Sequence, residues 1–266
     1  MTTVFFLFLT HLSLGLLMTL PLVPESAGRK YFKFCSAAAA FMATAGFWLL
    51  VRRFGLGGTA RAPGGARYRA LLTAAALMLL LTVLYNRGRH FGWARLQRVA
   101  LYGALLSGFL GIVLGAAPGG RWLVASTDLS SALLLGAAAA AMILGHWYLV
   151  VLDLPISALR RLTVLLIAAL ALRSTVIAWA LLGPVRAGLE DARLVAAGLW
   201  SPDGVFVWMR LLFGIAGPIS LLWFIWMTVE IRSTQSATGI LYVQLFLVLS
   251  GELLAKYLRV AAGLPL

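Results

Sequence analysis

The chain has 266 residues, of which 62% are hydrophobic and only 11% are charged, and its formal net charge is +14. So few charged side chains cannot cover the surface of a water-soluble domain that contains this much apolar material. The positive charge does not indicate a nucleic-acid partner, because nearly all Lys and Arg residues fall in short connections between apolar stretches, where membrane lipids are the expected partners. The composition therefore predicts an all-α, polytopic integral membrane helical bundle.

Eight apolar stretches are long enough to cross a hydrocarbon layer of about 30 Å as helices. The first begins without positive charges and contains no small-residue cleavage site, so we expect it to remain as a span. The rest of the chain is too short for a separate soluble domain, which predicts a single transmembrane domain of residues 1–266. The predicted spans are 3–23, 33–51, 69–86, 98–117, 130–152, 160–182, 205–229 and 237–258.

An even number of spans places both termini on one side of the membrane, which we call side X, with side Y opposite. Lys and Arg are equally numerous on the two sides, so their total does not set the orientation. The first span has no charge before it and three positive residues after it, which favours side Y in the cytoplasm. We expect an integral protein of the bacterial inner (plasma) membrane with non-cytoplasmic termini.

The sequence also predicts an amphipathic connection, a helix bend and two regions of close helix packing. Residues 187–200 have an apolar face opposite Glu190, Asp191 and Arg193, which predicts one short interfacial helix. This helix could cover an entrance for a lipid-soluble ligand, but a plain connector is the simpler interpretation. Gly217-Pro218 predicts a bend in the seventh span. Small residues predict close helix packing at Gly103, Ser107, Gly111 and Gly115 and at 136–145.

Four ionisable residues lie inside four different predicted spans. They are His11, Arg173, Arg210 and Glu252. At 1.5 Å per residue, each lies about 8 to 14 Å from side X. A charge at that depth is costly unless it is paired or hydrated, so the shared depth indicates one polar layer. We expect the four side chains to approach one another around a cavity.

This layer allows two interpretations. Arg173 and Glu252 could form an ion pair that only fixes the helix register. Arg210 would then reach the interface, and His11 would donate to a backbone carbonyl. The alternative is a binding site, because two guanidiniums exceed one carboxylate and favour a polar or anionic ligand. We favour the site, with His11 and Glu252 as catalytic proton-exchanging residues and the two arginines as cofactor-binding residues.

His146 lies about 24 Å from side X, about 12 Å deeper than His11. That difference disfavours a bis-histidine haem held by both rings. With its two aromatic neighbours, His146 fits the aromatic belt on side Y. The alternative is a cofactor-binding role, in which His146 joins Arg160 and Arg161 around an anionic headgroup.

Familiar catalytic and metal motifs are missing from the sequence. The single cysteine, Cys35, excludes an intramolecular disulfide, and we expect its side chain to be buried as a small hydrophobic residue. We expect no metal site.

Three functions remain. The one we favour is a membrane subunit of a respiratory-type electron-transfer complex that binds a quinone or quinol and works with cofactor-bearing partner subunits. The others are a transporter or lipid-handling protein for an anionic substrate, and a structural or assembly subunit.

Overall fold

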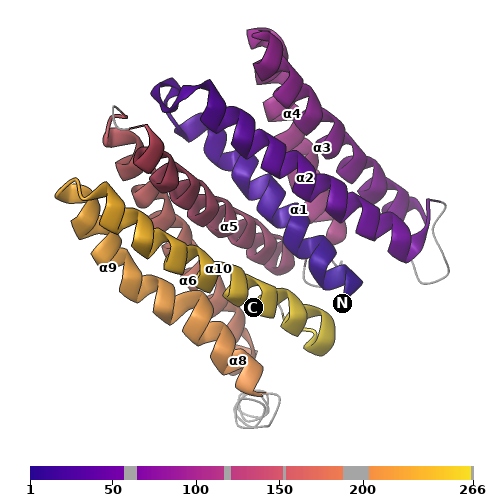
Figure 1. Ribbon diagram of the computed structural model, residues 1–266. Coiled ribbons are helices and arrows are strands. Elements are labelled where there is room, and N and C mark those ends of the chain that lie inside the picture. The colour runs from indigo at the N-terminus through magenta and orange to yellow at the C-terminus, as the bar shows by residue number, and fades with distance from the viewer. Residues whose placement is uncertain (57–64, 117–120, 152–153, 188–203, 265–266) are drawn as a thin grey trace.

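The computed structural model describes residues 1–56, 65–116, 121–151, 154–187 and 204–264. These residues form helices and no strand (Figure 1). Eight segments are long and apolar enough to cross a membrane, with α8, a π-helical turn and α9 forming one of them. The predicted all-α bundle of eight candidate transmembrane segments is thus confirmed. The helices are α1 (Thr2–Thr19), α2 (Gly28–Phe54), α3 (Gly65–Phe91), α4 (Ala94–Gly115), α5 (Arg121–Val150), α6 (Ser157–Ala187), α8 (Gly204–Leu211), α9 (Gly217–Glu230) and α10 (Thr234–Ala262).

Several helices extend beyond the predicted spans. α2 begins at Gly28 and α3 at Gly65, several residues before the predicted starts at 33 and 69. Charged residues such as Arg29 continue the helix because their long side chains can reach the headgroup layer while the backbone stays hydrogen-bonded. The predicted interfacial helix at 187–200 lies outside the described residues, apart from Ala187, which ends α6.

Two helices occupy the centre of the bundle. In the apolar windows of α1 and α5, 61% of residues are buried, against 22 to 39% in the other six spans. The two helices cross where Gly15 meets Gly136, and a Cβ added to either glycine would overlap the backbone of the other helix. The predicted close packing at Gly136 is confirmed. This crossing joins α1–α4 to the second half of the bundle, α5–α10 (Figure 1).

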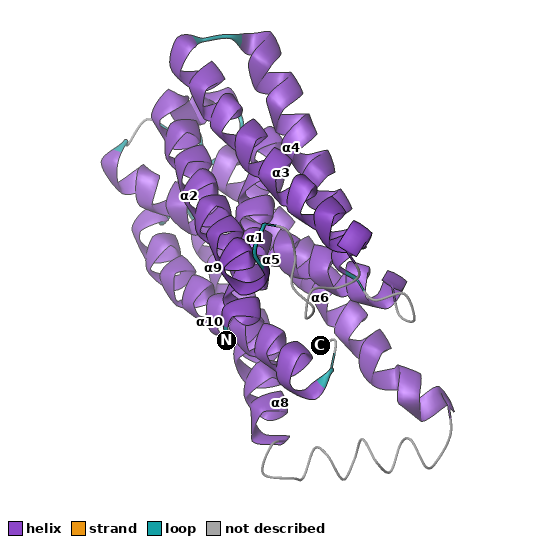
Figure 2. Ribbon diagram, turned by 90° about the vertical axis from the view of Figure 1, so that its right-hand side faces the viewer, coloured by secondary structure: helices purple, strands orange, loops and turns teal. Residues whose placement is uncertain are grey.

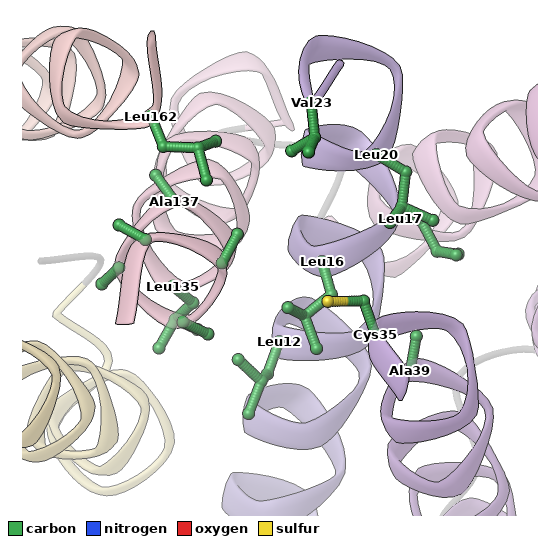
Figure 3. Close-up of a cluster of buried hydrophobic side chains, with 14 of the residues drawn as sticks. Leu12, Leu16, Leu17, Leu20, Val23, Cys35, Ala39, Leu135, Ala137 and Leu162 are labelled. Carbon is green, nitrogen blue, oxygen red and sulfur yellow. The ribbon is translucent and has the colours of Figure 1, made fainter. Parts of the chain in front are cut away.

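The main apolar core surrounds the second half of α1, where residues 11–17 are all buried. Figure 3 shows Leu12, Leu16 and Leu17 of α1, with Leu20 and Val23 that follow this helix, between α2 and α5. Cys35 of α2 contributes its thiol to this cluster and is 1% exposed, as expected for a small buried hydrophobe. The hydroxyl of Ser13 donates to the carbonyl of Ala39 at 2.8 Å, so α1 and α2 are also joined by a polar contact.

The start of α1 and the end of α10 lie at the same end of the bundle (Figure 2). Met1 and Phe5 line one groove together with Leu253 and Tyr257. This is the arrangement that an even number of spans requires. We keep the name side X for this end and side Y for the other.

The seventh span departs from a straight α-helix, though not at the predicted position. The sequence predicts a bend at Gly217-Pro218, whereas the structure has a π-helical turn over Leu212–Ala216, directly before these residues. Proline cannot donate to the preceding turn, so the backbone adjusts there. On α4, Gly103 and Gly111 face Leu81 and Ala74 of α3 as the packing prediction requires, but Gly115 faces open space.

Candidate functional site

An ion pair joins α6 to α10 inside the bundle. Arg173 donates from Nε to Oε1 of Glu252 at 2.9 Å and from Nη2 to Oε2 at 3.0 Å. Both side chains are 0% exposed. Two parallel hydrogen bonds of this kind match the planar guanidinium to the carboxylate and fix their relative orientation. α5 supports the pair, because Ser131 donates to Oε2 of Glu252 and the carbonyl of Thr127 accepts from Nη1 of Arg173.

A second arginine reaches the same carboxylate from α8. Arg210 donates from Nη2 to Oε1 of Glu252 at 2.7 Å and is also 0% exposed. It lies two residues before the π-helical turn, and its guanidinium occupies space left by Gly214 and Gly251. A Cβ on Gly214 would overlap Nη1 of Arg210, and a Cβ on Gly251 would overlap Gly214. The two glycines therefore make room for a buried arginine between α8 and α10.

A second polar cluster is centred on Asp128 of α5. Lys256 places Nζ 3.2 Å from Oδ1 of Asp128, and Arg259 donates from Nη1 to the same carboxylate. His11 of α1 places Nδ1 3.8 Å from Oδ1. The side chains of Asp128, Lys256 and His11 are at most 5% exposed, and that of Arg259 is 19% exposed.

Helix periodicity places the two clusters side by side. Asp128 and Ser131 are one turn apart on α5, and Glu252, Lys256 and Arg259 follow at i, i+4 and i+7 on one face of α10. Since α5 contacts α10, these two faces meet. We call the combined set the buried charge network. Its members are His11, Asp128, Arg173, Arg210, Glu252, Lys256 and Arg259.

The buried charge network carries more positive than negative charge. Four Lys and Arg side chains face two carboxylates, which gives a formal charge of +2 with a neutral imidazole. Nε and Nη1 of Arg210 and Nδ1 of His11 have no hydrogen-bond partner among the described residues. Burying such charge in apolar surroundings is costly, so the excess positive charge favours polar or anionic partners, such as water or a ligand.

A cavity of about 260 Å³ adjoins this network among α1, α2, α3 and α4. Most of its lining is apolar, and the wall that faces α5 and α10 carries His11, Asp128 and Arg259. The lining of this cavity does not include Arg173, Arg210 or Glu252. The cavity could therefore hold an apolar molecule whose polar group meets the His11–Asp128 side.

The structure places the sequence-predicted residues in three positions. Arg173, Arg210 and Glu252 meet directly, while His11 lies at Asp128 on the neighbouring cluster. His146 is exposed on α5, where Nδ1 lies 3.0 Å from the hydroxyl of Tyr242. From Asp128 to His146 is about 27 Å along α5, which is far beyond the span of two ligands on one haem iron.

Asp128, Lys256 and Arg259 are functional candidates that the sequence analysis missed. The predicted span begins at 130, which leaves Asp128 in a connection. Arg259 follows the last predicted span, 237–258, and Lys256 lies two residues before the end of that span. The spacing of Glu252, Lys256 and Arg259 on one face was the signal that could have found them. Among the described residues, no group of three or more His, Cys, Asp or Glu side chains gathers as a metal site would require.

No protein-family model, curated protein or solved structure matches this chain. The geometry of the site is therefore the basis for assigning a function.

Proposed function

We propose that the chain is a membrane subunit of an electron-transfer complex and binds a quinone or quinol headgroup in the cavity beside His11. One observation carries this proposal: a mostly apolar cavity inside an apolar bundle has a buried His–Asp pair on one wall. Quinones have an apolar ring and tail with two oxygens that exchange protons, so they suit such a lining.

The chemistry assigns a role to each polar group on this wall. Reduction of a quinone to a quinol adds two electrons and two protons to its two oxygens. His11 would exchange a proton with one quinone oxygen through Nε2, the ring nitrogen that does not face Asp128. Asp128 would hold the imidazole, and Arg259 would polarise the oxygen. The electrons would come from a partner subunit that carries the redox cofactor.

This proposal changes the role expected for Glu252. Its carboxylate accepts hydrogen bonds from Arg173, Arg210 and Ser131, and it does not line the cavity. A carboxylate held by two guanidiniums keeps its negative charge and is a poor proton carrier. We therefore propose that Glu252 and the two arginines fix α5, α6, α8 and α10 around the site, while His11 and Asp128 handle the proton.

Binding of short-tailed quinones tests the proposal. Purified protein in detergent is titrated with a naphthoquinone and a benzoquinone, and binding is followed by quenching of tryptophan fluorescence. We expect the H11L variant to bind about tenfold more weakly, because a buried hydrogen bond is lost. The matched control is H146L, which should bind like the unmodified chain. Absence of quinone binding by the unmodified chain, or equal losses in both variants, would contradict the proposal.

A second candidate is the handling of an anionic amphiphile, such as a fatty acid. The formal charge of +2 in the buried charge network and the position of Arg259 on the cavity wall favour it. The same titration with oleate in place of quinone distinguishes the two. Saturable oleate binding that R259Q abolishes, without quinone binding, would support this candidate.

A further inference from the structure

A strongly basic surface patch lies on side Y, where α2, α3 and α4 meet. Seven Lys and Arg residues and one acidic residue, Glu25, give it a formal charge of +6 among the described residues. We call this the α2–α4 basic patch. Its basic members are Arg29, Lys30, Lys33, Arg87, Arg89, Arg95 and Arg98.

The patch is built on the turn between α3 and α4, which α2 holds in place. Arg29 donates from Nη2 to the carbonyl of Arg89 at 3.0 Å, and Lys33 lies 3.2 Å from Nδ1 of His90. Gly92 has a φ of +79°, a conformation that L side chains rarely adopt, and it allows the tight turn. These contacts fix the backbone that carries the charges, although the side chains lie at the surface.

The positive charges in the patch are only partly compensated. Arg89 forms an ion pair with Glu25 at 3.0 Å and lies over the ring of Phe32. Arg87, Arg95 and Arg98 are exposed, and no carboxylate of the described residues lies within ion-pair distance of them. Three guanidiniums thus face the surroundings at one end of three apolar helices.

An exposed aromatic pair lies on the same turn. Phe91 and Trp93 are 55% and 58% exposed, and their rings stack with centroids 5.2 Å apart. Exposed aromatic rings at the ends of membrane helices sit at the level of the lipid headgroups. The guanidiniums next to them would lie at the depth of the phosphates.

We propose that the α2–α4 basic patch binds the headgroups of anionic phospholipids. Guanidinium groups bind phosphate through paired hydrogen bonds, and the aromatic pair places them in the headgroup layer. A soluble acidic partner would leave the exposed rings of Phe91 and Trp93 without a use, whereas a lipid layer accommodates both features. The proposal is independent of the quinone site, because the patch lies on side Y and that site lies toward side X.

Native mass spectrometry tests lipid binding directly. The purified protein is titrated with phosphatidylglycerol or phosphatidylcholine, and the triple variant R87Q/R95Q/R98Q is compared with R52Q/R53Q/R69Q. The latter removes the same charge from exposed arginines on side X. We expect the unmodified chain to prefer phosphatidylglycerol. The side Y variant should bind it at least about tenfold more weakly, since each basic residue near a lipid surface contributes several-fold to binding.

Four further outcomes decide the proposal. The variant R87K/R95K/R98K, which keeps the charge, should retain most of the binding, and it also reports whether substitution there disturbs the fold. Equal losses in the side X and side Y variants would overturn the proposal by showing that net charge alone matters. The proposal would also be overturned if the unmodified chain bound both lipids equally, or if inorganic phosphate alone displaced the lipid from it.

Discussion

Arg173 and Glu252 lie 79 residues apart in the chain and meet through two hydrogen bonds of 2.9 and 3.0 Å, with both side chains fully buried. Arg210 completes the arrangement at 2.7 Å from the same carboxylate. A carboxylate shared by two guanidiniums inside an apolar bundle cannot be removed without leaving uncompensated charge. The three residues therefore tie α6 and α8 to α10 at a defined height in the bundle.

We predict that E252Q lowers the stability of the folded protein by about 3 to 5 kcal/mol, because two buried guanidiniums lose their counter-ion. Thermal unfolding of the purified variant in detergent measures this. The control is E230Q, which breaks the partly exposed Arg160–Glu230 ion pair and should cost less than about 1 kcal/mol. Unchanged stability together with lost quinone binding would instead support the proton-exchanging role that the sequence analysis expected for Glu252 from its depth in the predicted span.

We predict that G214A disrupts the contact between α8 and α10. The added methyl group would overlap the guanidinium of Arg210, which is fully buried and bound to Glu252, and it would lie 3.2 Å from Cα of Gly251. The variant should unfold at a clearly lower temperature than the unmodified chain. G239A in α10 is the control, because a Cβ there meets no atom within 4 Å and alanine favours helix by up to about 1 kcal/mol. Equal melting temperatures for the two variants would contradict the packing described for Arg210.

Much of the architecture follows from the sequence because the bilayer leaves the backbone few options. A stretch of apolar residues such as the first span must satisfy its amides internally, so its length alone predicts a helix. The depths of Arg173 and Glu252 likewise predicted that they share a layer. Hydropathy also limited the prediction, since Asp128 and Arg259 lie at span ends where charges are expected in water. Only the crossing of α5 and α10 shows that these two residues meet.

Other details depend on packing that no single segment encodes. The π-helical turn at Leu212–Ala216 results from proline chemistry together with the fit of Arg210 between Gly214 and Gly251. The position of His11 against Asp128 instead of Glu252 is set by the rotation of α1, which the Gly15–Gly136 crossing fixes. An apolar helix such as α1 carries little periodic signal, so its rotation could not be predicted from the sequence.

We predict that D128N destabilises the protein by about 3 kcal/mol, because Lys256 loses its buried counter-ion and Arg259 loses its principal partner. Adding K256M should restore at least about 1 kcal/mol, since a buried cation is then replaced by an apolar side chain of similar length. Chemical or thermal unfolding of the single and double variants measures the coupling. Additive effects of the two substitutions would mean that the Asp128–Lys256 contact carries no net interaction.

The last prediction concerns the two faces of the membrane. Thr2 and Ala262 lie at the ends of α1 and α10 on side X, whereas His90 lies at the α3–α4 turn on side Y. In a C35S background, the variants T2C and A262C should react with a membrane-impermeant maleimide from the same face, and H90C from the other. With side Y in the cytoplasm, as the charges around the first span predict, intact cells should label T2C and A262C. H90C should label only after permeabilisation.

Each result of this labelling has a distinct structural meaning. Labelling of T2C and A262C from opposite faces would contradict eight spans and require that one helix does not cross the membrane. Labelling of all three in the reversed pattern would keep the bundle but invert it, which would place the cavity beside His11 toward the cytoplasm. The α2–α4 basic patch would then face the non-cytoplasmic lipid layer. Under the proposed function, the orientation would therefore decide from which side the site beside His11 takes up protons, because Arg259, the most exposed member of the buried charge network, lies at the end of α10 on side X.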